Sequence, residues 1–195
     1  MTATTSKPEL GLTAGTWEID TAHSEITFAV RHLMTTVRGS FTRFTGRVEM
    51  AEDPMRSQAH ADIEIDSIDT RNDERDAHVR SAEILDVENH PRMSFTTTGV
   101  KEAPRRRHAA QQRYEVSGDL TIRGVTQPIT LVTEFEGVAE DQWGGVRAGF
   151  IASTTINRRD FGVAFNIPLS GDRAVLGDEI DVQLQVQAVR PADAD

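Results

Sequence analysis

Histidine has the most versatile chemistry in this sequence, and the chain contains six of them. His23 and His32 lie on or beside one strand-like run, whereas His78 and His90 lie in a later polar segment. A zinc-type site needs three or four converging ligands, usually with close local spacing, and neither an HxH nor an HExxH pattern occurs. Cysteine is absent, which excludes disulfides, thiolate chemistry and cysteine-ligated metals. We therefore expect structural histidines and no metal site.

A nucleophilic triad can be written from Asp20, His23 and Ser24, which are close in sequence. Successive residues of a strand point to opposite faces, so these side chains cannot converge locally as a triad requires. The sequence also lacks a G-x-S-x-G nucleophile motif and a phosphate-binding glycine loop. These motifs predict no catalytic residue.

The motif TINRRDFG places Arg158, Arg159 and Asp160 directly after an apolar run. The simpler interpretation is a turn that contains an Arg–Asp pair. The alternative is a polar rim, which would include His32 and would hold the head group of a ligand such as a quinone or a phosphate. The second basic cluster, RRRH at residues 105–108, is interpreted as the solvated tip of a loop.

Strands must position these side chains, because apolar residues alternate with polar ones along most of the chain. Eight runs show this pattern, at residues 25–33, 38–50, 60–68, 92–96, 113–124, 128–137, 146–156 and 179–189. Clean alternation is typical of antiparallel sheets with one solvated face. An even number of similar strands favours an all-β, eight-stranded antiparallel up-and-down barrel. Phe41 and Phe44 have opposite parity, which predicts a bulge or strong twist between Thr42 and Gly46.

One polar excursion interrupts the strands at about residues 70–91, within the longer stretch Thr70–Phe95. Asn72 or Asp73 is a suitable helix N-cap, and Pro91 should end the segment. We expect one or two short helices that cover one end of the barrel. The thin apolar stripe of the excursion could gate a ligand or cap the core; it comprises Val79, Ile84, Leu85 and Val87.

Small residues occur on the inward faces of several strands, where a filled barrel core would normally carry larger aliphatic side chains. They are Ala59, Ala61, Gly118, Ala148 and Ala152. The space they leave could hold one small ligand, as other eight-stranded barrels do. Alternatively, neighbouring phenylalanine side chains fill the gaps.

Composition restricts the partners. The chain has 195 residues and a formal net charge of −10, which argues against binding to nucleic acid or to anionic lipid surfaces. No run approaches the roughly 18 apolar residues of a membrane helix, and no secretory signal is seen, so we expect a cytoplasmic protein. We expect flexible ends at residues 1–15 and 191–195 and one domain at 16–190. A homodimer is compatible with the sequence, although nothing requires one.

Five segments together resemble the YceI-like family, the lipocalin-like, polyisoprenoid-binding group of bacterial proteins. They are WEIDTAHSEITFAVRHLMTTVRGSFTRFTG, IDSIDTRNDERDAHVRSAEILDVENHPRMSF, YEVSGDLTIRGVTQPITL, WGGVRAGFIASTTINRRDFG and VLGDEIDVQLQVQAV. The resemblance runs from about Trp17 to Val189. It implies an eight-stranded barrel whose apolar tunnel holds an isoprenoid chain, such as that of a quinone. Many members carry a secretory signal, and this chain departs from that pattern.

The sequence and the resemblance together predict a non-enzymatic, cofactor-free protein that binds an isoprenoid lipid or quinone. Face parity and motif position suggest the tunnel lining, which comprises Phe28, Val30, Phe41, Phe44, Ile63, Ile65, Leu85, Phe95, Leu120, Ile122, Phe135, Phe150, Phe161 and Phe165. A second hypothesis is an enzyme acting on an apolar substrate, with His32, His78 and Asp76 as acid–base groups. A third is a stress-related interaction protein whose cavity is incidental.

Overall fold

The alternating runs of the sequence form eleven strands in a computed structural model that describes residues 11–104, 111–142, 144–167 and 175–190. The strands are β1 (Gly15–Ile19), β2 (Glu25–His32), β3 (Thr35–Phe41), β4 (Phe44–Met50), β5 (Gln58–Glu64), β6 (Ile68–Asp69), β7 (Arg92–Ala103), β8 (Gln112–Ile122), β9 (Val125–Glu140), β10 (Val146–Asn157) and β11 (Leu176–Val189). The basic cluster at 105–108, residues 1–10 and the predicted tail at 191–195 lie outside the described residues.

The strands belong to eight longer runs, because the first three runs are each broken once. β1 and β2 both pair with β11, β3 and β4 pair with β2 and β1, and β5 and β6 pair with β4 and β3. The second run breaks at Thr42–Arg43, where Thr42 N–H donates to the Ser67 carbonyl at 3.2 Å. This break lies within the predicted irregular stretch between Thr42 and Gly46.

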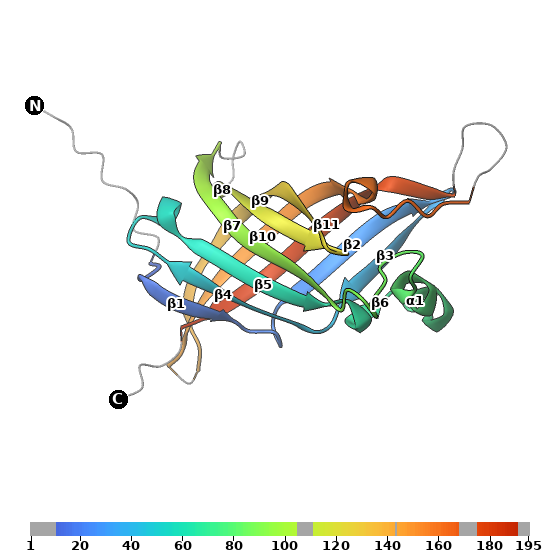
Figure 1. Ribbon diagram of the computed structural model, residues 1–195. Coiled ribbons are helices and arrows are strands. Elements are labelled where there is room, and N and C mark those ends of the chain that lie inside the picture. Colours follow the sequence, from blue (N-terminus) through green and yellow to red (C-terminus); the bar gives the residue numbers. More distant parts are fainter. Residues whose placement is uncertain (1–10, 105–110, 143, 168–174, 191–195) are drawn as a thin grey trace, which may run out of the picture.

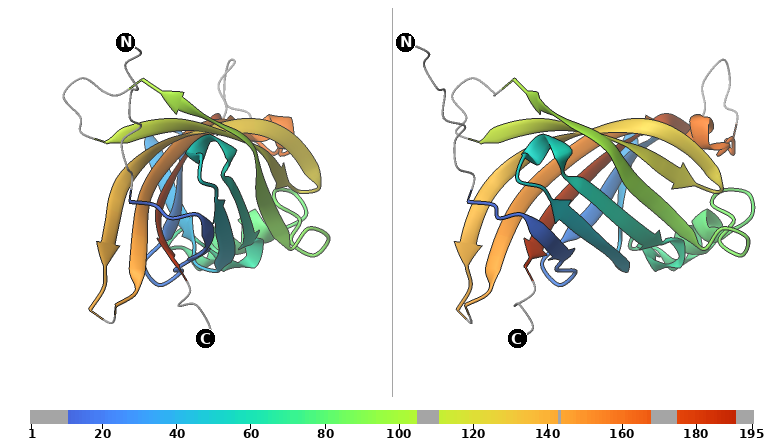
Figure 2. Two further views of the ribbon diagram at one scale, coloured as in Figure 1. Left: turned by 90° about the vertical axis from the view of Figure 1, so that its left-hand side faces the viewer. Right: turned by 60° about the vertical axis from the view of Figure 1, so that its left-hand side comes forward.

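Every run pairs antiparallel with the next run in sequence, and the last returns to the first through β1–β11 and β2–β11. This connectivity confirms the predicted eight-stranded antiparallel up-and-down barrel (Figure 1). Figure 2 shows, in its left panel, the strands wrapped around a single interior. The β8–β9 hairpin turns through Arg123 and Gly124, whose φ angles of 52° and 74° suit a tight turn of this kind.

The predicted excursion contains one α-helix, α1 (Asp73–Arg80), and it follows the short 3₁₀ helix η2 (Ile65–Ser67) and β6. Asn72 is its N-cap, and the side-chain oxygen accepts from Arg75 N–H at 2.8 Å, as predicted. Turns follow until β7 begins at Arg92, directly after Pro91. Among the described residues, no helix is long and apolar enough to cross a membrane.

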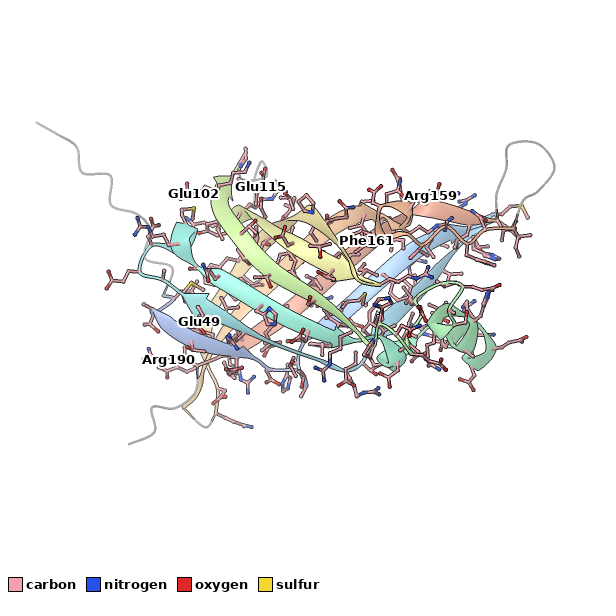
Figure 3. The ribbon with its side chains drawn as sticks, viewed as in Figure 1. Glu49, Glu102, Glu115, Arg159, Phe161 and Arg190 are labelled. Carbon is pink, nitrogen blue, oxygen red and sulfur yellow. The ribbon has the colours of Figure 1, made fainter. Side chains whose placement is uncertain are left out.

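The two ends of the barrel differ. One end, which we call the helix end, carries α1 and the 3₁₀ helix η3 (Arg158–Phe161) (Figure 1). The other end carries β1 and the 3₁₀ helix η1 (Pro54–Arg56) between β4 and β5, and we call it the cavity end after the cavity described below. Figure 3 shows Phe161 and Arg159 in the half toward the helix end, and Glu49 and Arg190 toward the cavity end.

β1 was not among the eight predicted runs. Its buried side chain is that of Trp17. The indole is only 1% exposed, and its Nε1–H donates to the Thr13 carbonyl at 3.0 Å. Trp17 packs in a cluster with Met50, Tyr114 and Phe135. Five residues give too short an alternation to distinguish a strand from a polar terminus, so the large apolar side chain of Trp17 was the available signal.

Candidate functional site

An apolar cavity of about 180 Å³ lies in the cavity-end half of the barrel. Residues of β4, β5 and β7 to β11 form most of its wall, and Leu12, Ile19, Pro54 and Ser57 complete it. Phe135 and Phe150 lie side by side in this wall, with ring centroids 5.5 Å apart. Ala59, Ala61 and Ala152 also line the cavity, so three of the five small inward residues border open space.

Most polar side chains of the cavity wall form hydrogen bonds to other groups of the protein. Thr97 Oγ1 accepts from Ala59 N–H at 3.1 Å, and Tyr114 Oη donates to Gln112 Oε1 at 2.9 Å. Ser57 Oγ accepts from Ala51 N–H at 3.1 Å. Such a wall favours an apolar occupant and offers few groups that could distinguish one polar head group from another.

The helix-end half is filled instead of hollow. A buried cluster occupies it, comprising Phe44, Ile63, Ile65, Met93, Ile122, Ile156 and Phe161. Leu85 and Val87 of the excursion pack against this cluster. No residue of 70–91 appears in the wall of the cavity, as far as the structure describes the chain, so the excursion covers packed core at the end remote from the cavity.

The fourteen predicted lining residues divide between the two halves. Phe95, Phe135 and Phe150 line the cavity. Eight belong to the helix-end core or pack against it: Phe41, Phe44, Ile63, Ile65, Leu85, Leu120, Ile122 and Phe161. The remaining three are half-buried near the helix end: Phe28 beside Phe41 at 5.6 Å, Val30 in β2, and Phe165 against His78 at 4.8 Å.

Several cavity residues were not among the predicted lining. They include Leu12, Ile19, Val48, Met50, Val100, Tyr114, Val116, Leu131, Thr133, Leu184 and Val186. Most carry the inward parity of their strands, so the signal existed, but parity alone does not say where along the barrel the packing is loose. Leu12 lies within the segment 1–15 that we expected to be flexible, and it packs against the cluster around Trp17.

Arg158, one of the predicted rim residues, is buried and 3% exposed. Its guanidinium donates to the carbonyls of Val163, Phe165 and Gly177 at 2.7–2.9 Å and to Asp178 Oδ1 at 2.6 Å. Burial lowers the pKa of Arg158. These bonds give Arg158 a structural role as the clamp between η3 and β11.

Of the other predicted rim residues, Arg159 shares an acidic partner with Arg158. Arg159 Nε donates to Asp178 Oδ2 at 2.7 Å, and Asp160 is exposed. His32 is half-buried at the end of β2. The motif therefore forms a turn whose two arginines pair with Asp178 of β11, outside the motif, and not with Asp160.

The three residues of the enzyme hypothesis have separate surroundings. Asp76, 4% exposed, accepts from Thr70 N–H at 3.0 Å and from Thr70 Oγ1 at 2.5 Å, which fastens α1 to the end of β6. His78 Nε2 lies 2.9 Å from Glu83 Oε2. Neither Asp76, His78 nor His32 lines the cavity. Within the described ranges, no three His, Asp or Glu side chains are grouped so that they could hold a metal ion.

A charged cluster joins the β1–β2 turn to β10 near the cavity end. Asp20 accepts from Arg147, lies 2.9 Å from His23 Nδ1, and shares Arg147 with Asp141, which accepts from Nε at 3.0 Å. The hydrogen bond from Arg147 is the main cause that lowers the pKa of Asp20 to about 2, against the opposing effect of burial. Ser24, the third member of the conceivable triad, bonds to Gln187 of β11 instead.

A family model, the YceI-like domain, matches residues 17–188. The chain belongs to the YceI-like family. Two UPF0312 proteins are among its curated relatives. The one from Pectobacterium atrosepticum is 36% identical over 171 residues, which cover 86% of this chain and 82% of that protein. The one from Photorhabdus laumondii is 34% identical over 200 residues, which cover 94% and 97%.

Solved structures also resemble this barrel. BcnA from Burkholderia cenocepacia matches with a TM-score of 0.70 at 21% identity, over 87% of this chain and 98% of that chain. The YCEI protein of Campylobacter jejuni matches at 0.65 and 26%, over 83% and 90%. A polyisoprenoid binding domain from Saccharophagus degradans, implicated in plant cell wall breakdown, matches at 0.66 and 13%, over 90% and 98%.

Proposed function

We propose that this YceI-like barrel binds an isoprenoid lipid, either a polyprenyl chain or an isoprenoid quinone, and holds the chain in its apolar cavity. The proposed role is carriage, storage or sequestration of the lipid, without catalysis and without a cofactor. The observation that carries the proposal is the cavity itself, which lies between the strands and presents an almost wholly apolar surface.

The energetics favour an apolar chain in this space. Each buried methylene gains about 0.8 kcal/mol, so even a short isoprenoid tail would bind appreciably in a wall of Val, Leu and Phe side chains. The fold of the Saccharophagus degradans polyisoprenoid binding domain supports the same reading of the barrel. The enzyme alternative has less support, because Asp76, His78 and His32 lie apart from the cavity.

Extraction tests the proposal directly. The purified protein is extracted with organic solvent, the extract is analysed by mass spectrometry, and the stripped protein is titrated with a quinone and with farnesol. A co-purifying isoprenoid, or saturable binding of either probe, is expected. Repeatedly empty preparations together with no binding of either probe would contradict the proposal and favour an interaction protein with an incidental cavity.

Filling the cavity should weaken lipid binding without unfolding the barrel. Ala152 is 6% exposed and faces the cavity from β10, so Ala152→Phe places a ring in the ligand space. We expect a loss of farnesol affinity of about tenfold or more, with overpacking costing about 1–3 kcal/mol of stability. Ser153→Phe is the matched control, since the next residue of β10 is exposed on the outer face. Equal affinities in the two variants would show that this face does not bind the lipid.

A further inference from the structure

The cavity ends abruptly at a layer of three residues halfway along the barrel. Phe95, Leu131 and Ala152 form one buried cluster, and all three line the cavity. Leu120 and Ile129 pack against this cluster and also against the helix-end core, and neither lines the cavity. This layer forms part of the boundary between open space and filled core, together with Ile19 and Ala61, which line the cavity and also pack against that core. We call the three-residue layer the cavity floor.

Phe95 has the largest side chain of the cavity floor, and its position depends on the absence of a side chain at Gly118. Its ring lies over Gly118 of the neighbouring strand β8, where an added Cβ would come within 2.3 Å of Phe95 Cζ and 2.4 Å of Cε2. Phe95 is 9% exposed and stands opposite Ala61 and Leu120 in the sheet register. Gly118 thus supplies a recess that accommodates the ring.

The volume above the floor is small for a lipid site. Ligand pockets commonly measure about 300–1,000 Å³, and an apolar cavity of about 150 Å³ is large enough for benzene. At about 180 Å³, the cavity holds on the order of one to two five-carbon isoprene units. A longer chain would have to displace the floor or leave its remaining units outside.

The helix-end core, on the side of the floor away from the cavity, is held by contacts that would resist its displacement. Leu85 and Val87 pack on it from the excursion, and Asp76 ties the start of that excursion to Thr70. On the opposite side, the buried Arg158 holds η3, which places Phe161 in the core. The filled half of the barrel is therefore stabilised by contacts of its own.

We propose that Phe95, seated on Gly118, sets the length of isoprenoid chain that the barrel encloses, and that a short terminal part of the lipid occupies the wild-type cavity. This inference rests on the proposed lipid-binding function. Affinity should rise with each added isoprene unit until the space above Phe95 is full, and it should then stay level, because further units remain in water.

A series of prenols measures this limit. Prenol, geraniol, farnesol and geranylgeraniol carry one to four isoprene units, and each displaces a fluorescent apolar probe from the full-length protein. We expect affinity to increase roughly tenfold or more per unit up to geraniol, and to change less than about threefold beyond it. Continued growth up to geranylgeraniol in the wild type would overturn the inference.

Variants locate the limit at Phe95. In Phe95→Ala, affinity should keep rising up to farnesol or beyond before it becomes level, so the levelling point moves to a longer prenol. Phe95→Leu keeps more of the core and should likewise raise farnesol affinity relative to geraniol. Met93→Ala is the matched control, because Met93 faces the same way from β7, two residues away, but belongs to the helix-end core. An unmoved levelling point in folded Phe95→Leu, or an equal movement in Met93→Ala, would refute the role of Phe95. Failure of all four prenols to bind the wild type would refute the lipid function itself.

Discussion

The carboxylate of Asp20 lies between a guanidinium and an imidazole, and this arrangement makes part of the stability depend on pH. Arg147 and His23 both contact it, and Arg147 also bonds to Asp141. The hydrogen bond to Asp20 and, after it, the bond to Asp141 raise the pKa of the guanidinium. The pKa of Asp20 is lowered from 3.8 to about 2 in the folded chain. A lowered carboxyl pKa means that the folded state favours the ionised form, so the contribution is present above the unfolded pKa.

Asp20→Asn should therefore lower the free energy of unfolding at neutral pH, by on the order of 1 kcal/mol because solvent screens the cluster. The difference from the wild type should shrink as the pH falls from about 4 toward about 2, where Asp20 becomes protonated. Urea unfolding at several pH values measures this difference. Glu52→Gln, which changes an exposed carboxyl, is the control. A difference that stays constant down to pH 2 would contradict the assignment.

At the scale of elements, the excursion around α1 supports the core and does not enclose the ligand space. Its N-cap at Asn72, the bond from Thr70 to Asp76 and the packing of Leu85 all stabilise the helix end. The cavity lies in the other half of the barrel. Loosening the excursion should therefore separate local order from ligand binding.

Asp76→Asn tests this separation. The variant weakens a hydrogen bond to a charged group, which is worth about 1.5–3 kcal/mol, so amide exchange across 70–90 should accelerate by about tenfold or more. Farnesol affinity should remain within about twofold of the wild-type value. Asp73→Asn, an exposed change in the same helix, serves as the comparison. Faster exchange accompanied by a matching loss of affinity would mean that the excursion gates the cavity after all.

Some features of these elements could be predicted from the sequence, and the position of the cavity could not. Period-two alternation predicted the eight runs, and Asn72 and Pro91 predicted the bounds of the excursion. The position of the cavity was not predictable, because it depends on which inward side chains meet across strands. Gly118 illustrates this: the sequence left open whether a ligand or a neighbouring phenylalanine fills the gap beside it, and the register brings Phe95 onto it. Alternation identifies faces, whereas register decides which gaps are filled.

For the molecule as a whole, the closing seam between β11 and the first run is interrupted between β1 and β2. β2 pairs with β11 along its length, but β1 contributes only Glu18 and Ile19, opposite Val189 and Ala188. Between these two stretches, Gln187 of β11 bonds to the β1–β2 turn: its carbonyl accepts from Asp20 N–H at 2.9 Å, and its N–H donates to Ser24 Oγ at 3.0 Å. One backbone bond and one hydroxyl thus bridge the interruption in the seam.

Ser24→Ala should weaken this seam, because it leaves the Gln187 amide without its acceptor. We expect a loss of about 1–3 kcal/mol in unfolding free energy and faster amide exchange in β1 and at Gln187, with β9 and β10 nearly unaffected. Ser153→Ala, on the outer face of β10, is the control. Uniformly faster exchange across all strands would argue that the seam does not open independently.

The closing pair also brings the first and last described residues together. Arg190 Nη1 donates to Thr13 Oγ1 at 2.8 Å, and the neighbouring Leu12 lies in the cavity wall. A fluorescent reporter attached near either of these residues would sit beside the lipid compartment, whereas one attached at the β8–β9 turn would sit at the far end, toward α1 (Figure 1). The geometry thus makes this barrel a convenient scaffold for a ligand-occupancy sensor with an internal negative reference.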